Sequence, residues 1–259
     1  MIDGEKILEY IKRDPYYIKS VENPTKEMAS IAISQNPNLI RFIKNQGFDL
    51  KWQALKSSPW IIEHIQNPTE EMCIYAVKNA WNTLKYIKDP SENTIKAAIG
   101  MKGWAIQFIE NPSLEIQRMA VKKDADAIKY IKNPSDEIIV LAVKKDWSYI
   151  KHIKNPSFEV QLEAVKAQEQ AMIYIKELTE EKVRLFLKVN FKVVKYLNKD
   201  YEDLAKKVVI EEISKEDVDE DFILDFIKTE ALNINKFKFI HKFGSMKAKG
   251  IFVDYNLGM

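Results

Sequence analysis

The segment Tyr130–Lys166 reads YIKNPSDEIIVLAVKKDWSYIKHIKNPSFEVQLEAVK and contains nearly the same sequence twice. One copy, IKNPSDEIIVLAVKK, begins at Ile131, and the other, IKNPSFEVQLEAVKA, begins at Ile153. The offset from Ile131 to Ile153 therefore defines a repeat period. Self-similarity at a fixed interval of this length indicates a tandem-repeat protein.

The same period extends through most of the chain. Nine frames of this length fit without a gap, from 1–22 to 177–198, and the positions within a frame are called columns 1 to 22. Column 10 is alanine in seven consecutive frames, from Ala32 to Ala164, and columns 11, 18 and 21 are apolar in every frame. An Asn-Pro or Asp-Pro pair opens six of the frames, at Asn23, Asn67, Asp89, Asn111, Asn133 and Asn155.

Each frame predicts two helices. Columns 6, 7, 10 and 11 have helical spacing, which predicts a helix over columns 2 to 13. Asn at column 1 is a favourable N-cap, and Pro at column 2 suits the first helical position because its missing N–H would be unbonded there. Columns 15 to 22 predict a shorter helix with columns 17, 18 and 21 facing inward. Neither helix is stable alone in water at this length, so stacked frames must bury both, and the alanine column predicts close helix approach.

The pattern N-P-[ST]-x-E-[IV]-x-x-x-A-V-K occurs at 133–144 and 155–166. It resembles the short tandem helical repeats of a bacterial and viral family of unassigned function, which also has an Ala-Val-Lys core. More distantly it is similar to leucine-rich-variant and HEAT-like repeats, which implies a right-handed superhelix. The resemblance covers about residues 1–198 and carries over no functional site. The chain departs from the family's Gly-containing turn after Ala-Val-Lys, where it has Asp124, Asp146 or Gln168.

The predicted fold is all-α. Residues 1–198 are expected to form a right-handed α-solenoid of about nine 22-residue helical-hairpin repeats, and residues 199–259 a divergent C-terminal capping region. Within the cap, FILDFIK at Phe222–Lys228 has the pattern of another second helix. The final GIFVDYNLGM, Gly250–Met259, predicts a short strand or a docked tail.

The composition limits the class of protein. Hydrophobic residues make up 46% of the chain and charged residues 30%, as in folded soluble proteins. Because the net charge is only +2, any attraction to nucleic acid must come from the placement of charges. The single cysteine, Cys73, favours a reducing compartment, and no apolar run approaches the roughly 20 residues that span a bilayer. We expect a cytoplasmic protein with no membrane partner.

The sequence carries no motif for a particular chemistry. It has no glycine-rich phosphate loop and no nucleophile elbow, and its three histidines have no metal-ligand spacing with Cys73. The carboxylates that recur at column 5 and the lysines that recur at column 12 suit the two ends of a helix dipole. We therefore predict no enzyme, no metal and no cofactor.

The second predicted helix carries a repeated basic and aromatic pair at columns 19 and 20, outside its apolar stripe, and lysines recur at column 22. Since the shorter helix of a solenoid commonly lines the concave face, the rings would stack bases and the lysines would contact phosphates. The alternative is that the rings pack between adjacent repeats and the lysines keep the surface soluble. The candidate partner-binding residues are Arg41, Phe42, Lys85, Tyr86, Phe108, Lys129, Tyr130, Lys151, His152, Tyr174, Lys195 and Tyr196.

Four tryptophans lie near the predicted turn between the two helices: Trp60 and Trp104 at column 16, and Trp81 and Trp147 at column 15. They either fill the corner of the hairpin or anchor a protein partner.

These features predict a non-enzymatic helical-repeat binding protein that engages a macromolecular partner through its concave face. A protein partner is favoured because the net charge is close to zero. The alternative is binding of single-stranded RNA or DNA through the basic and aromatic columns. A weaker alternative, from the abundance of Ile, Lys and Asn that is typical of AT-rich genomes, is a mobile-element or phage protein that sequesters a host factor or ligand.

Overall fold

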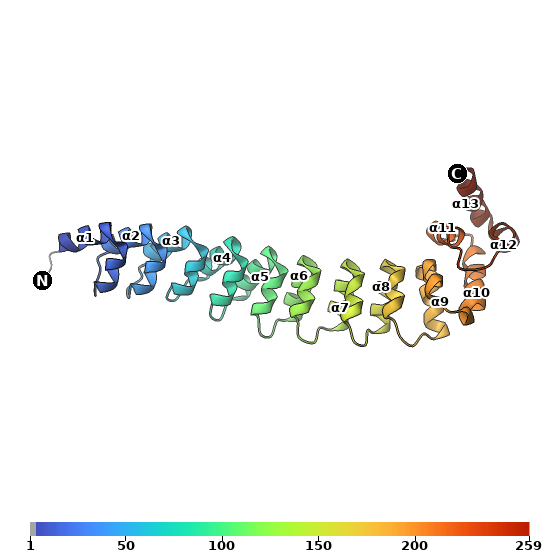
Figure 1. The fold of residues 1–259 in the computed structure, drawn as a ribbon, viewed down its shortest axis with the longest axis horizontal. Coiled ribbons are helices and arrows are strands. Elements are labelled where there is room, and N and C mark those ends of the chain that lie inside the picture. Colours follow the sequence, from blue (N-terminus) through green and yellow to red (C-terminus); the bar gives the residue numbers. More distant parts are fainter. Residues whose placement is uncertain (1–3, 259) are drawn as a thin grey trace. The chain divides into compact units, whose positions relative to one another are not determined.

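The computed structural model describes residues 4–258, and every regular element in that range is an α-helix or a 3-10 helix (Figure 1). The predicted all-α class is confirmed. The helices alternate through most of the chain, so that each α-helix is followed by a 3-10 helix at a regular spacing. None of the helices in this range combines the length and the apolar character needed to cross a bilayer.

The α-helices of the nine frames are equal in length, and each begins at column 4 of its frame, one repeat period after the helix before it. They are α1 (Gly4–Arg13), α2 (Lys26–Gln35), α3 (Phe48–Ser57), α4 (Glu70–Asn79), α5 (Glu92–Met101), α6 (Leu114–Lys123), α7 (Asp136–Lys145), α8 (Phe158–Ala167) and α9 (Glu180–Val189). Each one ends at column 13, where the sequence predicts the end of the first helix.

The predicted N-cap is wrong by two positions, because the cap is the hydroxyl residue at column 3. The side-chain oxygens of Thr25, Thr69 and Ser91 accept hydrogen bonds from the N–H groups of the third residue of their helices, at 3.2–3.3 Å. The Asn-Pro pair lies in the turn before the helix. Since the cap satisfies N–H groups that have no partner within the helix, Ser or Thr at column 3 stabilises the start of the helix in these frames. The helix α3 begins at the same column after Gly47 without a side-chain cap.

The residue at column 1, which is Asn in most frames, has a different role in several of them. Asn67, Asp89, Asn133 and Glu177 have positive φ values of 45°, 48°, 51° and 55°. This left-handed conformation crowds most side chains, and Asn and Asp are the non-glycine residues that adopt it most readily. In these frames the residue at column 1 therefore turns the chain between the 3-10 helix and the next α-helix.

The second helix of each frame is a short 3-10 helix over columns 15 to 20, shorter than the predicted 15 to 22. These are η1 (Pro15–Ser20), η2 (Pro37–Phe42), η3 (Pro59–His64), η4 (Trp81–Tyr86), η5 (Gly103–Phe108), η6 (Ala125–Tyr130), η7 (Trp147–His152), η8 (Glu169–Tyr174) and η9 (Phe191–Tyr196). The residue at column 14 separates the two helices. In the second frame, for example, the Asn36 N–H donates to the Ala32 carbonyl at 2.9 Å and the Asn36 side chain accepts from the Asn38 N–H at 3.1 Å.

The core consists of the apolar columns. From Ala32 to Ala164 every alanine of column 10 is 0% exposed, and the aliphatic residues of column 11 are buried beside them. Columns 17 and 18 of the 3-10 helices are mostly buried as well, as at Leu39 and Ile40. The two helices of a frame therefore bury one apolar face each, which neither could do alone.

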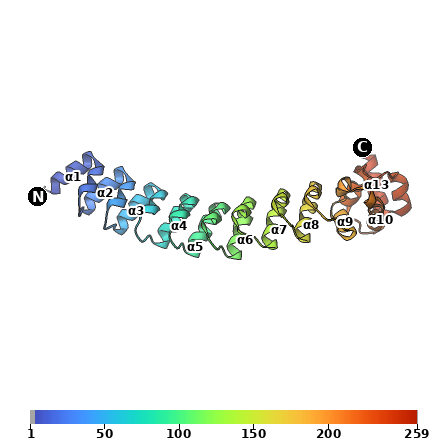
Figure 2. The ribbon, with the colours of Figure 1, turned by 60° about the horizontal axis from the view of Figure 1, so that its bottom comes forward.

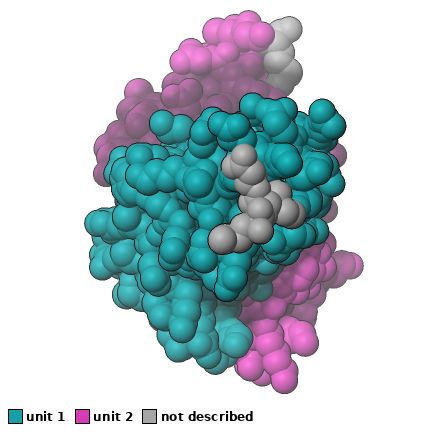
Figure 3. All heavy atoms as spheres, turned by 90° about the vertical axis from the view of Figure 1, so that its left-hand side faces the viewer, with its two compact units in different colours: residues 1–133 teal, residues 134–259 magenta. Residues whose placement is uncertain are grey.

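The chain divides into two compact units, residues 1–133 and residues 134–259 (Figure 3). Within each unit, the α-helices of consecutive frames contact one another, and so do the 3-10 helices of consecutive frames. In the first unit these rows run from α1 to α6 and from η1 to η6, in chain order (Figures 1 and 2). The predicted domain boundary at 198/199 lies inside the second unit and stays a prediction.

The second unit ends in helices that no longer follow the repeat spacing. After the short η10 (Lys199–Tyr201), α10 (Glu202–Ile213) packs on α9, and α11 (Glu220–Lys228), which contains FILDFIK, packs on η9. The chain finishes with α12 (Lys236–Phe243) and α13 (Met246–Leu257), and α13 contacts both α11 and α12. The expectation of a strand at the C-terminus is wrong, because α13 covers nearly all of that segment. Ser245 caps α13 by accepting from the Ala248 N–H at 3.2 Å.

Candidate binding face

The candidate residues occupy the last two positions of the 3-10 helices, and all of them are exposed or half-buried. We call this surface the basic–aromatic face. In the first unit it comprises Arg41, Phe42, Lys85, Tyr86, Phe108, Lys129 and Tyr130. In the second unit it comprises Lys151, His152, Tyr174, Lys195 and Tyr196. In the first unit η4, η5 and η6 are neighbours, and η3, which carries no candidate residue, separates them from η2. In the second unit η7, η8 and η9 are neighbours.

The rings of column 20 pack on tryptophans of the preceding 3-10 helix. The ring centroids of Trp60 and Tyr86 lie 6.3 Å apart, edge to face. Trp81 stacks on Phe108 at 6.0 Å, and Trp104 lies against Tyr130 at 6.1 Å. These three tryptophans therefore join neighbouring 3-10 helices, each through one ring of the next frame. In these three pairs the column 20 ring packs between adjacent repeats, which is one of the two interpretations of the sequence.

Cations lie over the faces of several of these rings. Lys19 Nζ is 4.7 Å from the ring centroid of Tyr16 and 4.7 Å from that of Phe42. The guanidinium of Arg41 is 4.8 Å from the same Phe42 ring, and Lys85 Nζ is 4.6 Å from Tyr86. The ring quadrupole attracts a cation at these distances. At Phe42 and Tyr86 in the first unit, basic and aromatic side chains therefore hold each other in place.

Sequence reasoning missed Lys19 and the pairing partners of column 20. Lys19 occupies column 19 of the first frame, so the column pattern contained the signal. The interval along the chain from Trp60 to Tyr86 equals the interval from Trp104 to Tyr130, because both pairs join column 16 of one frame to column 20 of the next. This regular offset is the sequence signal for the stacking of adjacent frames.

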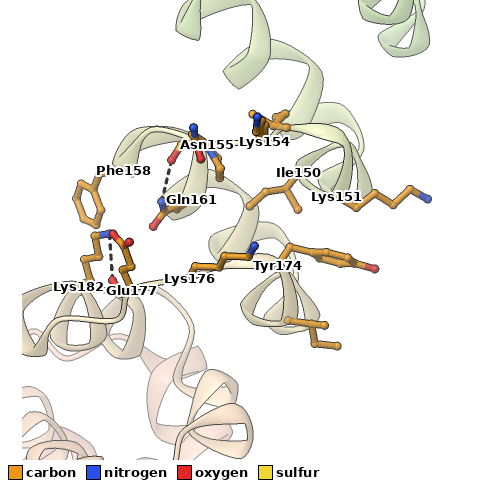
Figure 4. A pocket seen from close by; sticks show the side chains of 13 residues that line it. Ile150, Lys151, Lys154, Asn155, Phe158, Gln161, Tyr174, Lys176, Glu177 and Lys182 are labelled. Atoms are coloured by element: carbon orange, nitrogen blue, oxygen red, sulfur yellow. Dashed lines mark hydrogen bonds between the residues drawn. The ribbon is translucent and has the colours of Figure 1, made fainter.

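Cavities lie between neighbouring 3-10 helices at equivalent columns. One of about 640 Å³ lies between η3 and η4, and one of about 540 Å³ lies between η5 and η6, both in the first unit. In the second unit a cavity of about 620 Å³ lies between η7 and η8 (Figure 4). All three are lined by the ends of two 3-10 helices, by the turn at columns 1 and 2, and by the side chain at column 7.

The three cavities differ in charge. The first is lined by Glu63, Glu70, Lys88 and Asp89, and the second by Glu110 and Lys132. The third is lined by Lys151, Lys154, Lys176 and Lys182, with Glu177 as the acidic residue. The cavity of the second unit is therefore the one with an excess of positive charge among these three.

Two observations bear on metal binding and on nucleophilic chemistry in the described residues. Within residues 4–258 no three His, Cys, Asp or Glu side chains gather into a group that could hold a metal ion. Cys73 lines the first cavity but is buried, and burial raises the pKa of its thiol. A raised pKa disfavours the thiolate, which is the nucleophilic form.

Comparison with known proteins gives no relative. No protein-family model, no curated protein and no solved structure matches this chain.

Proposed function

We propose that this chain is a non-enzymatic helical-repeat protein, a right-handed α-solenoid, that binds a protein partner through the concave face made by its 3-10 helices. The observation that carries the proposal is the interlocked set of rings and cations on η1 to η6 of the first unit. Trp, Tyr and Arg dominate protein-binding hot spots, and side chains held in place before binding lose little entropy when a partner arrives.

The same contacts favour a protein over a nucleic acid. Base stacking requires an open ring face, and the cations near Phe42 and Tyr86 cover ring faces on this surface. A nucleic acid would have to displace them. Acidic residues such as Glu63 also lie on the 3-10 helices, where they would repel phosphates.

The test is a comparison of two charge-matched triple variants in the first unit. Arg41, Lys85 and Lys129 lie on the basic–aromatic face, whereas Lys56, Lys78 and Lys122 lie at column 12, on the α-helices. Each trio is changed to Gln, and partners captured from a lysate by the full chain are quantified by mass spectrometry. We expect the first triple to lose the captured protein and the second to retain it. Equal retention, or equal loss, would overturn the proposal.

A second arm tests nucleic acid directly. Labelled single-stranded RNA and DNA are titrated with the full chain at two salt concentrations. Because phosphate contacts release counterions, nucleic-acid binding weakens steeply as salt rises. Tight, salt-sensitive binding that the first triple abolishes would replace the protein partner with a nucleic acid.

A further inference from the structure

The cavity between η7 and η8 combines an unpaired hydrogen-bond acceptor with several lysines, and the proposed function does not use this combination. It is formed by the end of η7, the turn at Asn155 and Pro156, the first turns of α8, and the end of η8 (Figure 4). Its volume of about 620 Å³ is within the range of ligand pockets. Phe158 and Tyr174 give it apolar walls.

Gln161 lines this cavity, and its side chain has an acceptor with no partner. The residue is 7% exposed, and its Nε2 donates to the Pro156 carbonyl at 2.8 Å. Because a carbonyl oxygen can only accept, the amide must point its NH2 group at Pro156. Its Oε1 therefore faces away from the turn, as Figure 4 shows, and has no hydrogen-bond partner among residues 4–258. Leaving a buried acceptor unpaired costs free energy, so a ligand that donates a hydrogen bond here would be favoured.

The lysines that line the cavity supply positive charge for a ligand. Lys182 Nζ donates to the Glu177 carbonyl at 3.3 Å. Lys154 and Lys176 have no hydrogen bond or ion pair to any residue in the described range. Both lysines line the cavity, so a negative charge on a ligand there would be attracted by two ammonium groups. The cavity therefore fits a ligand that carries both a donor and a negative charge.

We propose that this cavity binds an acidic peptide in an extended conformation, with a backbone N–H donated to Gln161 Oε1 and a carboxylate held by Lys154 and Lys176. This deepens the proposed function, on which it rests, by naming the chemistry of the partner at one position. A peptide fits better than a phosphate group, because a fully ionised phosphate has no proton to donate to Gln161. An extended peptide turns alternate side chains to opposite faces, so one acidic residue can point at the lysines while its neighbours contact Phe158 and Tyr174.

The first unit offers a matched control. Gln117 also stands at column 7, and its Nε2 donates to the Pro112 carbonyl at 3.0 Å. It lines the cavity between η5 and η6, whose charged lining residues are Glu110 and Lys132. The same amide thus occurs in a cavity without the excess of lysines.

The experiment uses the full chain and fluorescence anisotropy with a labelled peptide of alternating Glu and Val. The same peptide with Gln in place of Glu is the neutral probe, and oligouridylate is the nucleic-acid probe. The double variant Lys154→Gln with Lys176→Gln is compared with Lys88→Gln with Lys132→Gln. The variant Gln161→Met is compared with Gln117→Met, and thermal melting checks that each variant is folded.

We expect the acidic peptide to bind the wild type and to bind the Lys154 and Lys176 double variant about tenfold more weakly, because charge-assisted hydrogen bonds are lost. Gln161→Met should weaken binding about fivefold, and both control variants should change it less than about twofold. Since Lys154 and Lys176 are exposed, their double variant tests the proposal even if Gln161→Met fails to fold.

Three results would overturn the proposal: equal binding of the neutral peptide, equal losses in the control variants, or tighter binding of oligouridylate at the same lysines. Failure of this inference and failure of the proposed function give different results. If the acidic peptide does not bind but the Arg41, Lys85 and Lys129 triple still loses its captured protein, the proposed function stands and this inference does not. If the acidic peptide binds as expected and the triple loses nothing, the basic–aromatic face is not the binding surface.

Discussion

A side-chain Cβ on Gly103 would lie 2.4 Å from the carbonyl oxygen of Ala120. Gly103 opens η5, and Ala120 is the column 10 alanine of α6, so this contact joins a 3-10 helix to the α-helix of the next frame. The Gly103 N–H also donates to Asp124 Oδ2 at 2.6 Å. At Ala120 the alanine column therefore lies where helices of neighbouring frames approach closely.

Gly103→Ala should destabilise the protein by about 1–3 kcal/mol, because the new methyl group overlaps backbone that cannot move without separating η5 from α6. The matched control is Gly100→Ala. Gly100 lies in α5, and a Cβ there would meet nothing within 4 Å. That change should stabilise the helix by about 0.5–1 kcal/mol. Urea denaturation of both variants measures the difference, and midpoints that shift in the same direction would refute the close contact.

The hydroxyl at column 3 should matter more than the asparagine at column 1 for starting a helix. Thr69 Oγ1 accepts from the Met72 N–H at 3.3 Å, and Asn67 makes the left-handed turn before it. Thr69→Ala should cost about 0.5–2 kcal/mol through the lost cap.

Asn67→Gly should cost little, since glycine adopts a positive φ readily. Hydrogen exchange followed by mass spectrometry locates the effect. Thr69→Ala should raise exchange first in α4 and its neighbours, because each pair of helices contacts only the adjacent pairs. A large loss of protection in Asn67→Gly with none in Thr69→Ala would restore column 1 as the cap.

The elements were predictable where apolar spacing determines them. Burial of columns 10, 11 and 18 follows from the period of the sequence, because those side chains point into the same helix pair in successive frames, although Tyr10 at column 10 of the first frame is exposed. The N-cap residue was not predictable from the sequence. Asn at column 1 and Ser at column 3 are both good N-cap residues, and only the backbone conformation separates their roles. The 3-10 form of the second helix was also not predictable, since a short segment with two adjacent apolar positions fits either kind of helix.

The candidate site was predictable in part for a similar reason. Columns 19 and 20 lie outside the apolar stripe, so their exposure follows from helical geometry. The cavities depend on side chains from two neighbouring frames, which the pattern of a single frame does not combine. The polar Gln161 at an otherwise mainly apolar column 7 was the signal in the sequence for the cavity between η7 and η8.

Trp60 and Tyr86 should be energetically coupled. Their rings meet edge to face across the contact between η3 and η4. In a double-mutant cycle with Trp60→Ala and Tyr86→Ala, we expect a coupling free energy of about 0.5–1.5 kcal/mol, as for other aromatic pairs. The cycle that combines Trp60→Ala with Phe108→Ala is the control, because Phe108 stacks on Trp81 instead. Coupling of the same size in both cycles would show that the rings do not act in pairs.

Lys236 should make stability depend on pH in the alkaline range. Its Nζ lies 3.8 Å from the ring centroid of Phe226 and has no hydrogen-bond acceptor within residues 4–258, and burial lowers the pKa of this amine to about 8. In the unfolded chain the pKa returns to its ordinary value of 10.5. Below pH 8 both states bear the proton, and the folded state carries the cost of holding a charged amine away from water.

Between pH 8 and 10.5 the folded state has released the proton while the unfolded state still binds it, so the free energy of unfolding should rise with pH across this window. Lys236→Met removes the buried charge. The variant should be more stable than the wild type at pH 7 by about 1–2 kcal/mol, after allowance for partial solvent access and for the lost attraction to Phe226. Its advantage should shrink as the pH approaches 10.5. Urea denaturation at pH 7, 9 and 10.5 measures this trend, with Lys238→Met on the exposed side of α12 as the control. If Lys236→Met is less stable than the wild type at pH 7, the attraction of the amine to Phe226 outweighs any cost of burial. If the difference in stability between variant and wild type does not vary with pH, the amine is solvated in the folded protein.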